Sequence, residues 1–158
     1  MGFHKNKEQQ STINYQPSTI NQNLTTINHQ LKTINQQLKK MEYIKLEVWI
    51  ETRKLTSLIY DATKLFPKEE LFGLTNQMRR CAVSVPSNIA EGSGRRTTKD
   101  TVHFLHISRG SLYELETQCY LALDQKYLDE NNFNIIFNQI QLSKKLLNGF
   151  INYYKKLI

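Results

Sequence analysis

The residues of this sequence best suited to bind an anion are basic side chains concentrated in the second half of the chain. Between positions 79 and 109 they are opposed only by Glu91 and Asp100, so this stretch carries a net charge of +4. The basic residues are Arg79, Arg80, Arg95, Arg96, Lys99 and Arg109. Guanidinium and ammonium groups form charge-assisted hydrogen bonds with phosphate oxygens. The stretch therefore predicts phosphate contact, and with it a nucleic-acid partner.

The basic residues fall into two groups. Arg95, Arg96 and Lys99 lie at a junction between helices, where they either contact phosphate or are simply solvated. The other arginines either contact phosphate as well or are neutralised inside a helical fold, because a buried charge requires a partner. These arginines are Arg79, Arg80 and Arg109, and the candidate partners are Glu91, Glu114 and Glu116. The junction is thus the first candidate for nucleic-acid binding, and Arg79 and Arg80 are the second.

The segment SVPSNIAEGSGRR, residues 84–96, contains the glycines and arginines of a possible phosphate loop. A nucleotide-binding P-loop follows a strand and opens a helix with Gly-Lys-Ser or Gly-Lys-Thr. No strand is predicted before this segment, and Gly94 is followed by arginine. The segment is better explained as a helix end, bent at Pro86 and closed by Gly92 and Gly94 in the left-handed conformation.

His103 and His106 stand three residues apart on a predicted helix and could share a metal ion, but a third ligand at a suitable spacing is missing. We therefore expect no metal and no cofactor. Arg96, followed after seven residues by His103, resembles the Arg/His pair of the helical HEPN ribonucleases, which would supply a phosphate clamp and a general acid–base. Glu114 and Glu116 fall on different faces of a helix, which argues against a paired-carboxylate site.

Four amphipathic helices must position these residues. The first has apolar side chains at helical spacing from Ile44 to Phe66 and ends before Pro67. The second runs from about Thr75 to Glu91, and the third starts at Thr97 or Thr98, either of which can cap it. The fourth follows the sequence DENN and carries a heptad stripe from Phe133 to Leu157. Because short connections join the helices and no segment indicates a strand, the pattern predicts an all-α, antiparallel four-helix bundle.

The third and fourth helices carry more apolar residues than one bundle core requires. On the fourth helix a second row lies beside the heptad stripe, at Ile135, Leu142, Leu146 and Tyr153. Such surplus rows indicate packing against another subunit, although a wide core filled by aromatic residues is the alternative.

The first forty residues differ from the rest and are predicted to form a separate low-complexity tail. The triplet TIN recurs at positions 12, 19, 26 and 33, and apolar residues alternate in steps of four and three, as in a coiled coil. Asn and Thr are poor helix formers, however, and Pro17 blocks extension backwards. Residues 1–40 are therefore either disordered or a short oligomerising helix, residues 41–158 form the folded domain, and Met41 is a possible natural start.

Bulk properties narrow the class of protein. The formal charge of the 158 residues is +7. Lys5, Lys7, Lys32, Lys39 and Lys40 against Glu8 give the tail +4, which leaves +3 for the folded domain. No apolar run approaches the roughly 20 residues needed to span a membrane, and the first residues lack a signal-peptide core, so a cytoplasmic protein without membrane contact is expected. Cys81 and Cys119 match no zinc spacing and are expected to be small buried residues.

Two long segments of the sequence resemble the signature of a known protein family. QMRRCAVSVPSNIAEGSGR and FLHISRGSLYELETQCYLA occur in this order, after LEVWIETRKL. They resemble the signature of bacterial four-helix-bundle proteins encoded in intervening sequences of large-subunit ribosomal RNA genes, and the accessory variability determinant of diversity-generating retroelements is similar. The resemblance covers about residues 41–158. The positions that match are Arg79, Arg80, Pro86, Asn88, Glu91, Gly92, Gly94, Arg95, Gly110, Ser111, Glu114 and Glu116.

The resemblance implies an up-and-down bundle that assembles into a ring-like homopentamer. It also implies a basic adaptor for RNA or for a nucleic-acid-processing protein, without catalysis of its own. We therefore expect a non-enzymatic, oligomeric accessory protein of a mobile or intervening element. The alternatives are a weak, metal-independent ribonuclease of the HEPN type and a purely structural assembly protein.

Overall fold

The computed structural model describes the backbone of residues 17–157 and the side chains of residues 19–34 and 43–157. This part of the chain is all-α, as the sequence predicts, and contains no strand. It comprises α1 (Pro17–Tyr43), α2 (Glu47–Thr63), the short 3₁₀ helix η1 (Lys68–Leu71), α3 (Leu74–Ser93), α4 (Thr98–Asp124) and α5 (Glu130–Lys155). The chain divides between Asn35 and Gln36 into two compact units, which are described separately.

The first unit contains most of α1, and the chain is helical from Pro17 onward. The apolar residues at heptad spacing lie on the outside of this helix with roughly half of their surface exposed: Ile20, Leu24, Ile27, Leu31 and Ile34. Three threonine hydroxyls donate to carbonyl oxygens one turn back in the same helix, for example Thr25 to Asn21 at 2.9 Å. Residues 1–16, which belong to the predicted tail, lie outside the described residues, and the predicted domain boundary at residue 40 stays a prediction.

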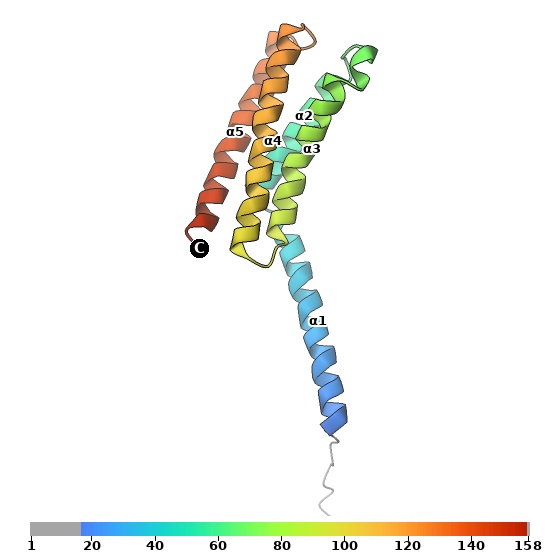
Figure 1. Cartoon of the computed structure of the whole chain (residues 1–158), viewed down its shortest axis with the longest axis vertical. Helices are drawn as coiled ribbons and strands as arrows, with labels where there is room; N and C mark the ends of the chain where they lie inside the picture. The colour runs from blue at the N-terminus through green and yellow to red at the C-terminus, as the bar shows by residue number, and fades with distance from the viewer. Residues whose placement is uncertain (1–16, 158) are drawn as a thin grey trace, which may run out of the picture. The chain divides into compact units, whose positions relative to one another are not determined.

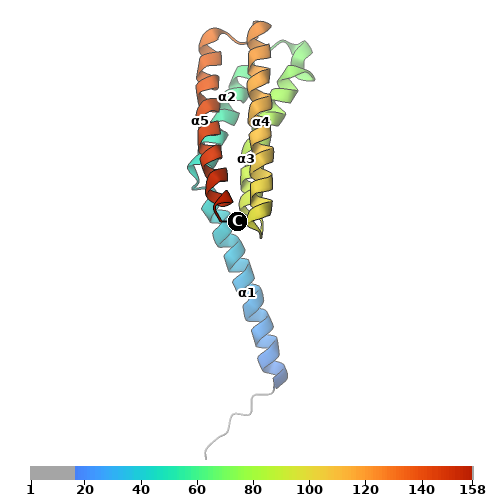
Figure 2. The ribbon, with the colours of Figure 1, turned by 60° about the vertical axis from the view of Figure 1, so that its left-hand side comes forward.

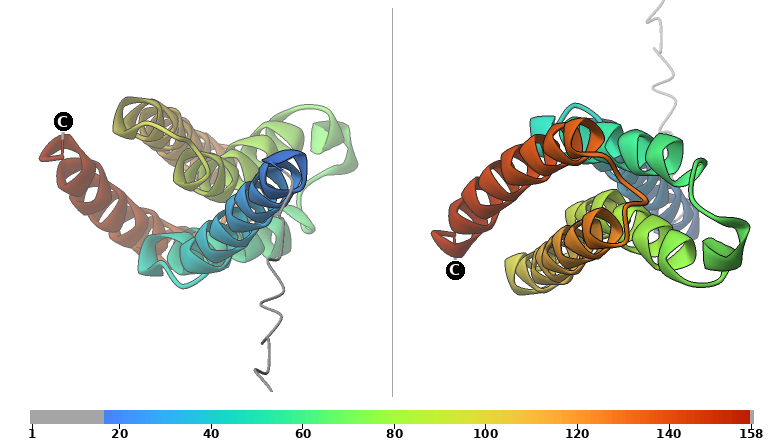
Figure 3. Two further views of the ribbon diagram at one scale, coloured as in Figure 1. Left: turned by 90° about the horizontal axis from the view of Figure 1, so that it is seen from below. Right: turned by 90° about the horizontal axis from the view of Figure 1, so that it is seen from above.

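The second unit is built from α2, α3, α4 and α5, which pack around one core. Each helix contacts the next along the chain, and α2 also packs against α5, so the four helices close a ring of contacts. Figures 1 and 2 show the α3–α4 junction and the C-terminal end of α5 at one end of this unit, and η1 at the other. Viewed along the helices, Figure 3 shows α5 beside α2 and α4 beside α3.

The core of this unit is aliphatic, and its largest side chains are completely buried. Leu55 and Ile59 come from α2, Met78, Val85 and Ile89 from α3, Leu105, Leu112 and Leu115 from α4, and Ile140, Leu147 and Ile151 from α5. The predicted core positions Val48, Leu55, Ile59 and Phe66 are buried, whereas Ile44 is 42% exposed because it precedes the start of α2. The helix also ends at Thr63, earlier than predicted.

Side-chain caps set the starts of the last two helices. The backbone N–H of Asp100 donates to Thr97 Oγ1 at 3.1 Å, so Thr97 is the N-cap of α4. The backbone N–H of Asn132 donates to Asp129 Oδ1 at 2.7 Å at the start of α5. Each cap satisfies an N–H group that has no partner inside its own helix. The helix start predicted near Thr97 is thus confirmed, whereas α5 begins at Glu130, inside the DENN segment that it was expected to follow.

Pro86 lies inside α3, where it leaves the carbonyl of Ala82 without its intrahelical donor. The hydroxyl of Thr56, on α2, donates to that carbonyl at 2.9 Å. The neighbouring Val85 carbonyl accepts a hydrogen bond from Ser108 of α4, also at 2.9 Å. The proline is therefore tolerated because two neighbouring helices supply hydrogen bonds beside it.

Candidate nucleic-acid interface

Arg95 and Arg96 lie in the short connection between α3 and α4. Helix α3 ends at Ser93, and its C-cap Gly94 has right-handed helical dihedrals, with its N–H donating to the carbonyls of Ala90 and Glu91. The N–H of Arg95 continues this turn by donating to the carbonyl of Gly92 at 3.1 Å. The connection is therefore a tight continuation of the helix that turns both arginine side chains outward.

The left-handed conformation predicted for Gly92 and Gly94 is wrong. No described glycine has a positive φ, and the single described residue that does is Lys126, in the α4–α5 connection. Gly92 is needed for a close approach between helices instead. A Cβ there would lie 3.2 Å from both the Cβ of Phe104 and the carbonyl oxygen of Thr101, and Thr101 Oγ1 donates to the Gly92 carbonyl at 2.9 Å. The absence of a side chain at Gly92 thus allows the start of α4 to pack against the end of α3.

The three basic residues of the junction differ in how far their charges are already neutralised. Arg95 forms an ion pair with Glu91, and its guanidinium carbon lies 4.2 Å from the centre of the Phe104 ring. Arg96 and Lys99 are exposed and make no side-chain hydrogen bond or ion pair within the described part of the chain. Arg96 and Lys99 therefore offer unpaired positive charges at this end of the unit.

The alternative in which the central arginines pair with buried glutamates is wrong for the described residues. Arg79 is half-buried, donates from Nε to Thr63 Oγ1 at 2.9 Å and lies over the ring of Tyr60 at 5.0 Å. Arg80 is exposed, Arg109 is half-buried, and neither forms an ion pair within residues 43–157. The glutamates have other partners, because Glu91 binds Arg95 and Glu116 binds Lys144.

Arg79 and Arg80 belong to a different surface from the junction. They line a separate hollow together with Tyr60, Ser111 and Glu114. Arg80 lies 13 residues before the end of α3 at Ser93, which corresponds to about 20 Å along the helix axis, and Arg95 lies beyond that end. The structure therefore does not bring all five candidate nucleic-acid-binding residues into one site.

Several of the other motif residues form hydrogen bonds within their own helix or with a neighbouring one. Asn88 donates to the Ser84 carbonyl at 2.8 Å and to Ser84 Oγ at 3.0 Å, and Ser84 Oγ is 2.9 Å from Ser111 Oγ of α4. Glu114 accepts a hydrogen bond from Gln118, and Glu116 accepts one from Gln141 of α5. Gly110 is exposed, with open space where a side chain would begin. The architectural role expected for this group stays a prediction.

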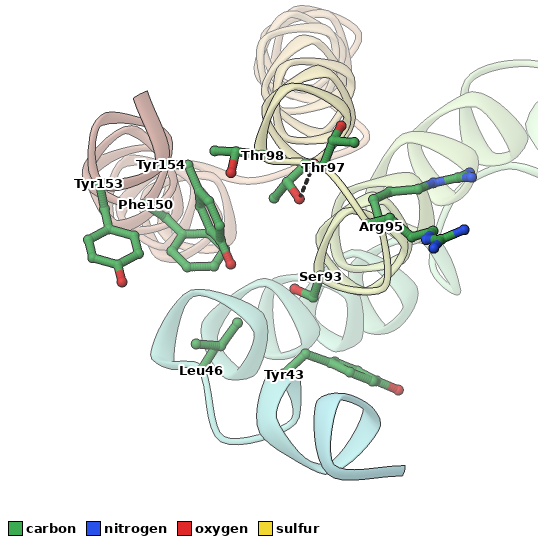
Figure 4. A pocket seen from close by; sticks show the side chains of 11 residues that line it. Tyr43, Leu46, Ser93, Arg95, Thr97, Thr98, Phe150, Tyr153 and Tyr154 are labelled. Atoms are coloured by element: carbon green, nitrogen blue, oxygen red, sulfur yellow. Dashed lines mark hydrogen bonds between the residues drawn. The ribbon is translucent and has the colours of Figure 1, made fainter. Parts of the chain in front are cut away.

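The hollow beside the junction contains residues that sequence reasoning assigned to other roles. A cavity of about 540 Å³ is lined there by four aromatic residues, four hydroxyl residues, two arginines and one leucine. These are Tyr43, Phe150, Tyr153, Tyr154, Ser93, Thr97, Thr98, Thr101, Arg95, Arg96 and Leu46. Figure 4 places the rings of α5 on one side and Arg95 on the other, with Ser93, Thr97 and Thr98 between them. The signal for this cavity in the sequence is the aromatic cluster at the end of α5, which the heptad pattern places in the core and in the second apolar row.

The aromatic rings of this cavity, called here the junction pocket, pack edge to face. The Phe150 and Tyr154 centroids are 5.0 Å apart and those of Tyr153 and Tyr154 are 5.3 Å apart, both with planes at 80°. Tyr153 is 58% exposed. Tyr43 packs edge-on against Trp49 at 5.1 Å, and the Arg53 guanidinium carbon lies 4.7 Å from the centre of the Trp49 ring. The pocket therefore combines fixed aromatic walls with one largely exposed ring.

The two histidines of α4 lie in different surroundings. His103 is exposed and packs against Phe104 at 5.6 Å, while burial lowers the pKa of His106, as do the nearby charges of Arg109, Lys155 and His103. No group of three or more possible ligands among His, Cys, Asp and Glu occurs in the described residues. Both cysteines are buried, and burial raises the pKa of the Cys81 thiol to about 11 and that of Cys119 to about 12. The thiols therefore stay protonated near neutral pH.

None of the described helices is long and apolar enough to cross a membrane.

Comparison with known proteins places the helical unit in a family. The family model described as 23S rRNA-intervening sequence protein matches residues 44–149. A crystal structure of a protein of unknown function from the S23 ribosomal protein family of Bacteroides thetaiotaomicron superimposes with a TM-score of 0.62 at 23% sequence identity. That match covers 66% of this chain and 95% of the other, and it shows a shared fold. No curated protein matches this chain.

Proposed function

This chain belongs to the family of 23S rRNA-intervening sequence proteins, and on that premise we propose that it is a non-enzymatic, oligomeric adaptor that associates with RNA. The proposal includes an antiparallel, up-and-down four-helix bundle formed by α2–α5. It is supported by the contact of each of these helices with its successor and by the packing of α2 against α5.

One observation supports the proposed association with RNA. Arg95, Arg96 and Lys99 gather at one end of the helical unit, and within the described residues Arg96 and Lys99 have no ionic partner. Phosphate contacts by such cations supply most of the sequence-independent affinity for nucleic acid. One subunit offers only these few cations at the junction, so measurable affinity requires that several copies present the junction together.

The oligomeric part of the proposal rests on exposed apolar residues of α4 and α5. They are Ile107, Tyr113, Tyr120, Leu121, Ile135 and Leu142. Exposed apolar side chains in this number support a subunit interface. The homopentamer implied by the family resemblance is the assembly we propose.

Reversing the two junction arginines, Arg95→Glu with Arg96→Glu, tests the RNA association. We expect it to abolish RNA binding and to flatten the dependence of affinity on salt, whose slope falls by about 0.9 for each lost phosphate contact on a duplex. The thermal midpoint should shift little, because the Arg95–Glu91 pair is 42% and 50% exposed and such pairs contribute little stability. Affinity is measured by fluorescence anisotropy at several salt concentrations.

The matched control is Lys64→Glu with Lys68→Glu, which changes the net charge equally at the η1 end of the unit. The control should retain RNA binding. If the junction variant binds RNA as tightly as the unaltered protein does, the junction does not contact RNA. The same samples test catalysis, because the RNA should be recovered intact. Cleavage that disappears in His103→Ala would establish the ribonuclease alternative instead.

A further inference from the structure

The described walls of the junction pocket exclude some ligands and admit others. None of its described lining residues is Asp or Glu, so the pocket provides no carboxylate to attract a cation. Its polar groups are hydroxyls and two arginines, which can donate hydrogen bonds to an anionic or neutral ligand. Its volume of about 540 Å³ lies within the range of small-ligand sites. The chemistry therefore fits a ligand that is flat and aromatic at one end and anionic at the other.

The two kinds of wall are separated in space. The α5 rings lie on one side of the hollow, and the side chain of Arg95 lies on the other and extends away from the rings (Figure 4). Arg96 also lines the pocket and has no ionic partner among the described residues. A base against the rings would thus leave its phosphate on the arginine side, with the hydroxyls of Ser93, Thr97 and Thr98 between them. This order of groups matches the order of base, sugar and phosphate in a nucleotide.

We propose that the junction pocket accepts one unpaired nucleotide of an RNA strand, with its base against the α5 rings and its phosphate at Arg96 and Arg95. This assignment rests on the proposed RNA association and makes it more specific. Bases in a duplex have both faces covered by their neighbours, whereas an unpaired base can be displaced from its stack and placed on an aromatic ring. The pocket therefore selects single-stranded RNA over duplex RNA.

The test compares two probes, a single-stranded RNA of about 12 nucleotides and the same strand annealed to its complement. Tyr153→Leu removes the most exposed ring of the pocket but keeps an apolar side chain, and Tyr153→Phe keeps the ring. Base stacking on an aromatic side chain contributes about 1–3 kcal/mol, so Tyr153→Leu should weaken single-strand binding by roughly 5- to 150-fold. It should leave duplex binding unchanged, and Tyr153→Phe should bind both probes as the unaltered protein does.

Phe72→Leu is the control, because it replaces an 85% exposed ring outside the pocket and should change neither affinity. Light scattering and circular dichroism confirm that the variants keep the assembly and the helices of the parent. Equal affinity of the unaltered protein for the two probes overturns the pocket assignment alone. An equal loss for both probes in Tyr153→Leu also overturns it. If neither probe binds the unaltered protein, the proposed RNA association itself fails.

Discussion

At the scale of single residues, the hydrogen bond from Thr56 to the Ala82 carbonyl makes the most specific prediction. Thr56→Val removes the hydroxyl and leaves the carbonyl of Ala82, a residue only 1% exposed, without a donor. An unsatisfied buried group costs about 1–3 kcal/mol, so we expect a loss of unfolding free energy of that size. Chemical denaturation followed by circular dichroism measures it.

A double-mutant cycle separates this effect from lost packing. Pro86→Ala restores an N–H one turn after Ala82, which can donate to the same carbonyl, so Thr56→Val should cost much less in that background. Ser57→Ala is the control, since the exposed Ser57 hydroxyl donates at 3.4 Å to the carbonyl of Arg53 within its own helix. An equal cost of Thr56→Val with and without Pro86 would contradict the proposed role of the hydroxyl.

Residue-level predictions succeeded where a local rule decided the outcome. Thr97 caps α4 because its hydroxyl reaches the N–H three residues on, a relation visible in the sequence. The prediction for Gly92 is wrong, because its small size serves contact with Phe104 and Thr101, and the sequence does not show which helix approaches it. Arg79 was misread for the same reason, since its partners Thr63 and Tyr60 lie on α2.

At the scale of elements, α1 is the helix whose stability depends most on a partner. It is rich in Asn, Gln and Thr, and an isolated helix of this composition is marginal in water. Its exposed row has Leu at heptad position a (24 and 31) and Ile at position d (20, 27 and 34), a spacing typical of helices that associate with one another. We therefore expect α1 to form through contact with the same helix of other copies.

Ile27→Asn with Leu31→Asn should lower the helical signal of the full chain and make it independent of protein concentration. His29→Asn with Lys32→Asn places the same amide side chains off the apolar row and should preserve the signal. Circular dichroism over a range of concentrations provides the comparison. Equal helicity in the two variants would show that the row has no partner.

The starts of α4 and α5 could be predicted to within a few residues because capping residues precede them. The end of α2 could not, because Phe66 continues the apolar pattern beyond Thr63 and is buried although it lies outside the helix. The junction pocket could not be predicted from the sequence either. Tyr43, Arg96 and Tyr153 come from distant parts of the chain, and only the packing of the helices brings them to one hollow.

At the scale of the whole molecule, the exposed apolar residues of α4 and α5 predict assembly that does not require the tail. A chain that begins at Met41 should remain a multimer in light scattering. Within it, Ile135→Lys with Leu142→Lys should yield monomers that keep most of their helicity, because both side chains are substantially exposed in the single chain. Burying an unpaired ammonium group in an interface is strongly unfavourable.

Asn134→Lys with Asn138→Lys adds the same charge to exposed positions of α5 outside that row, and this variant should still assemble. If the unaltered shortened chain is monomeric, the exposed apolar residues of α4 and α5 do not form a subunit interface.

The contact between Tyr43 and Trp49 gives the molecule an intrinsic optical reporter. Trp49 is the single tryptophan of the sequence, so its emission comes from one known place. The indole touches the ring of Tyr43, and that ring forms part of the junction pocket. A ligand that enters the pocket changes the surroundings of Tyr43 and, through it, those of the indole. The intensity and wavelength of the emission should therefore follow occupancy without any attached dye.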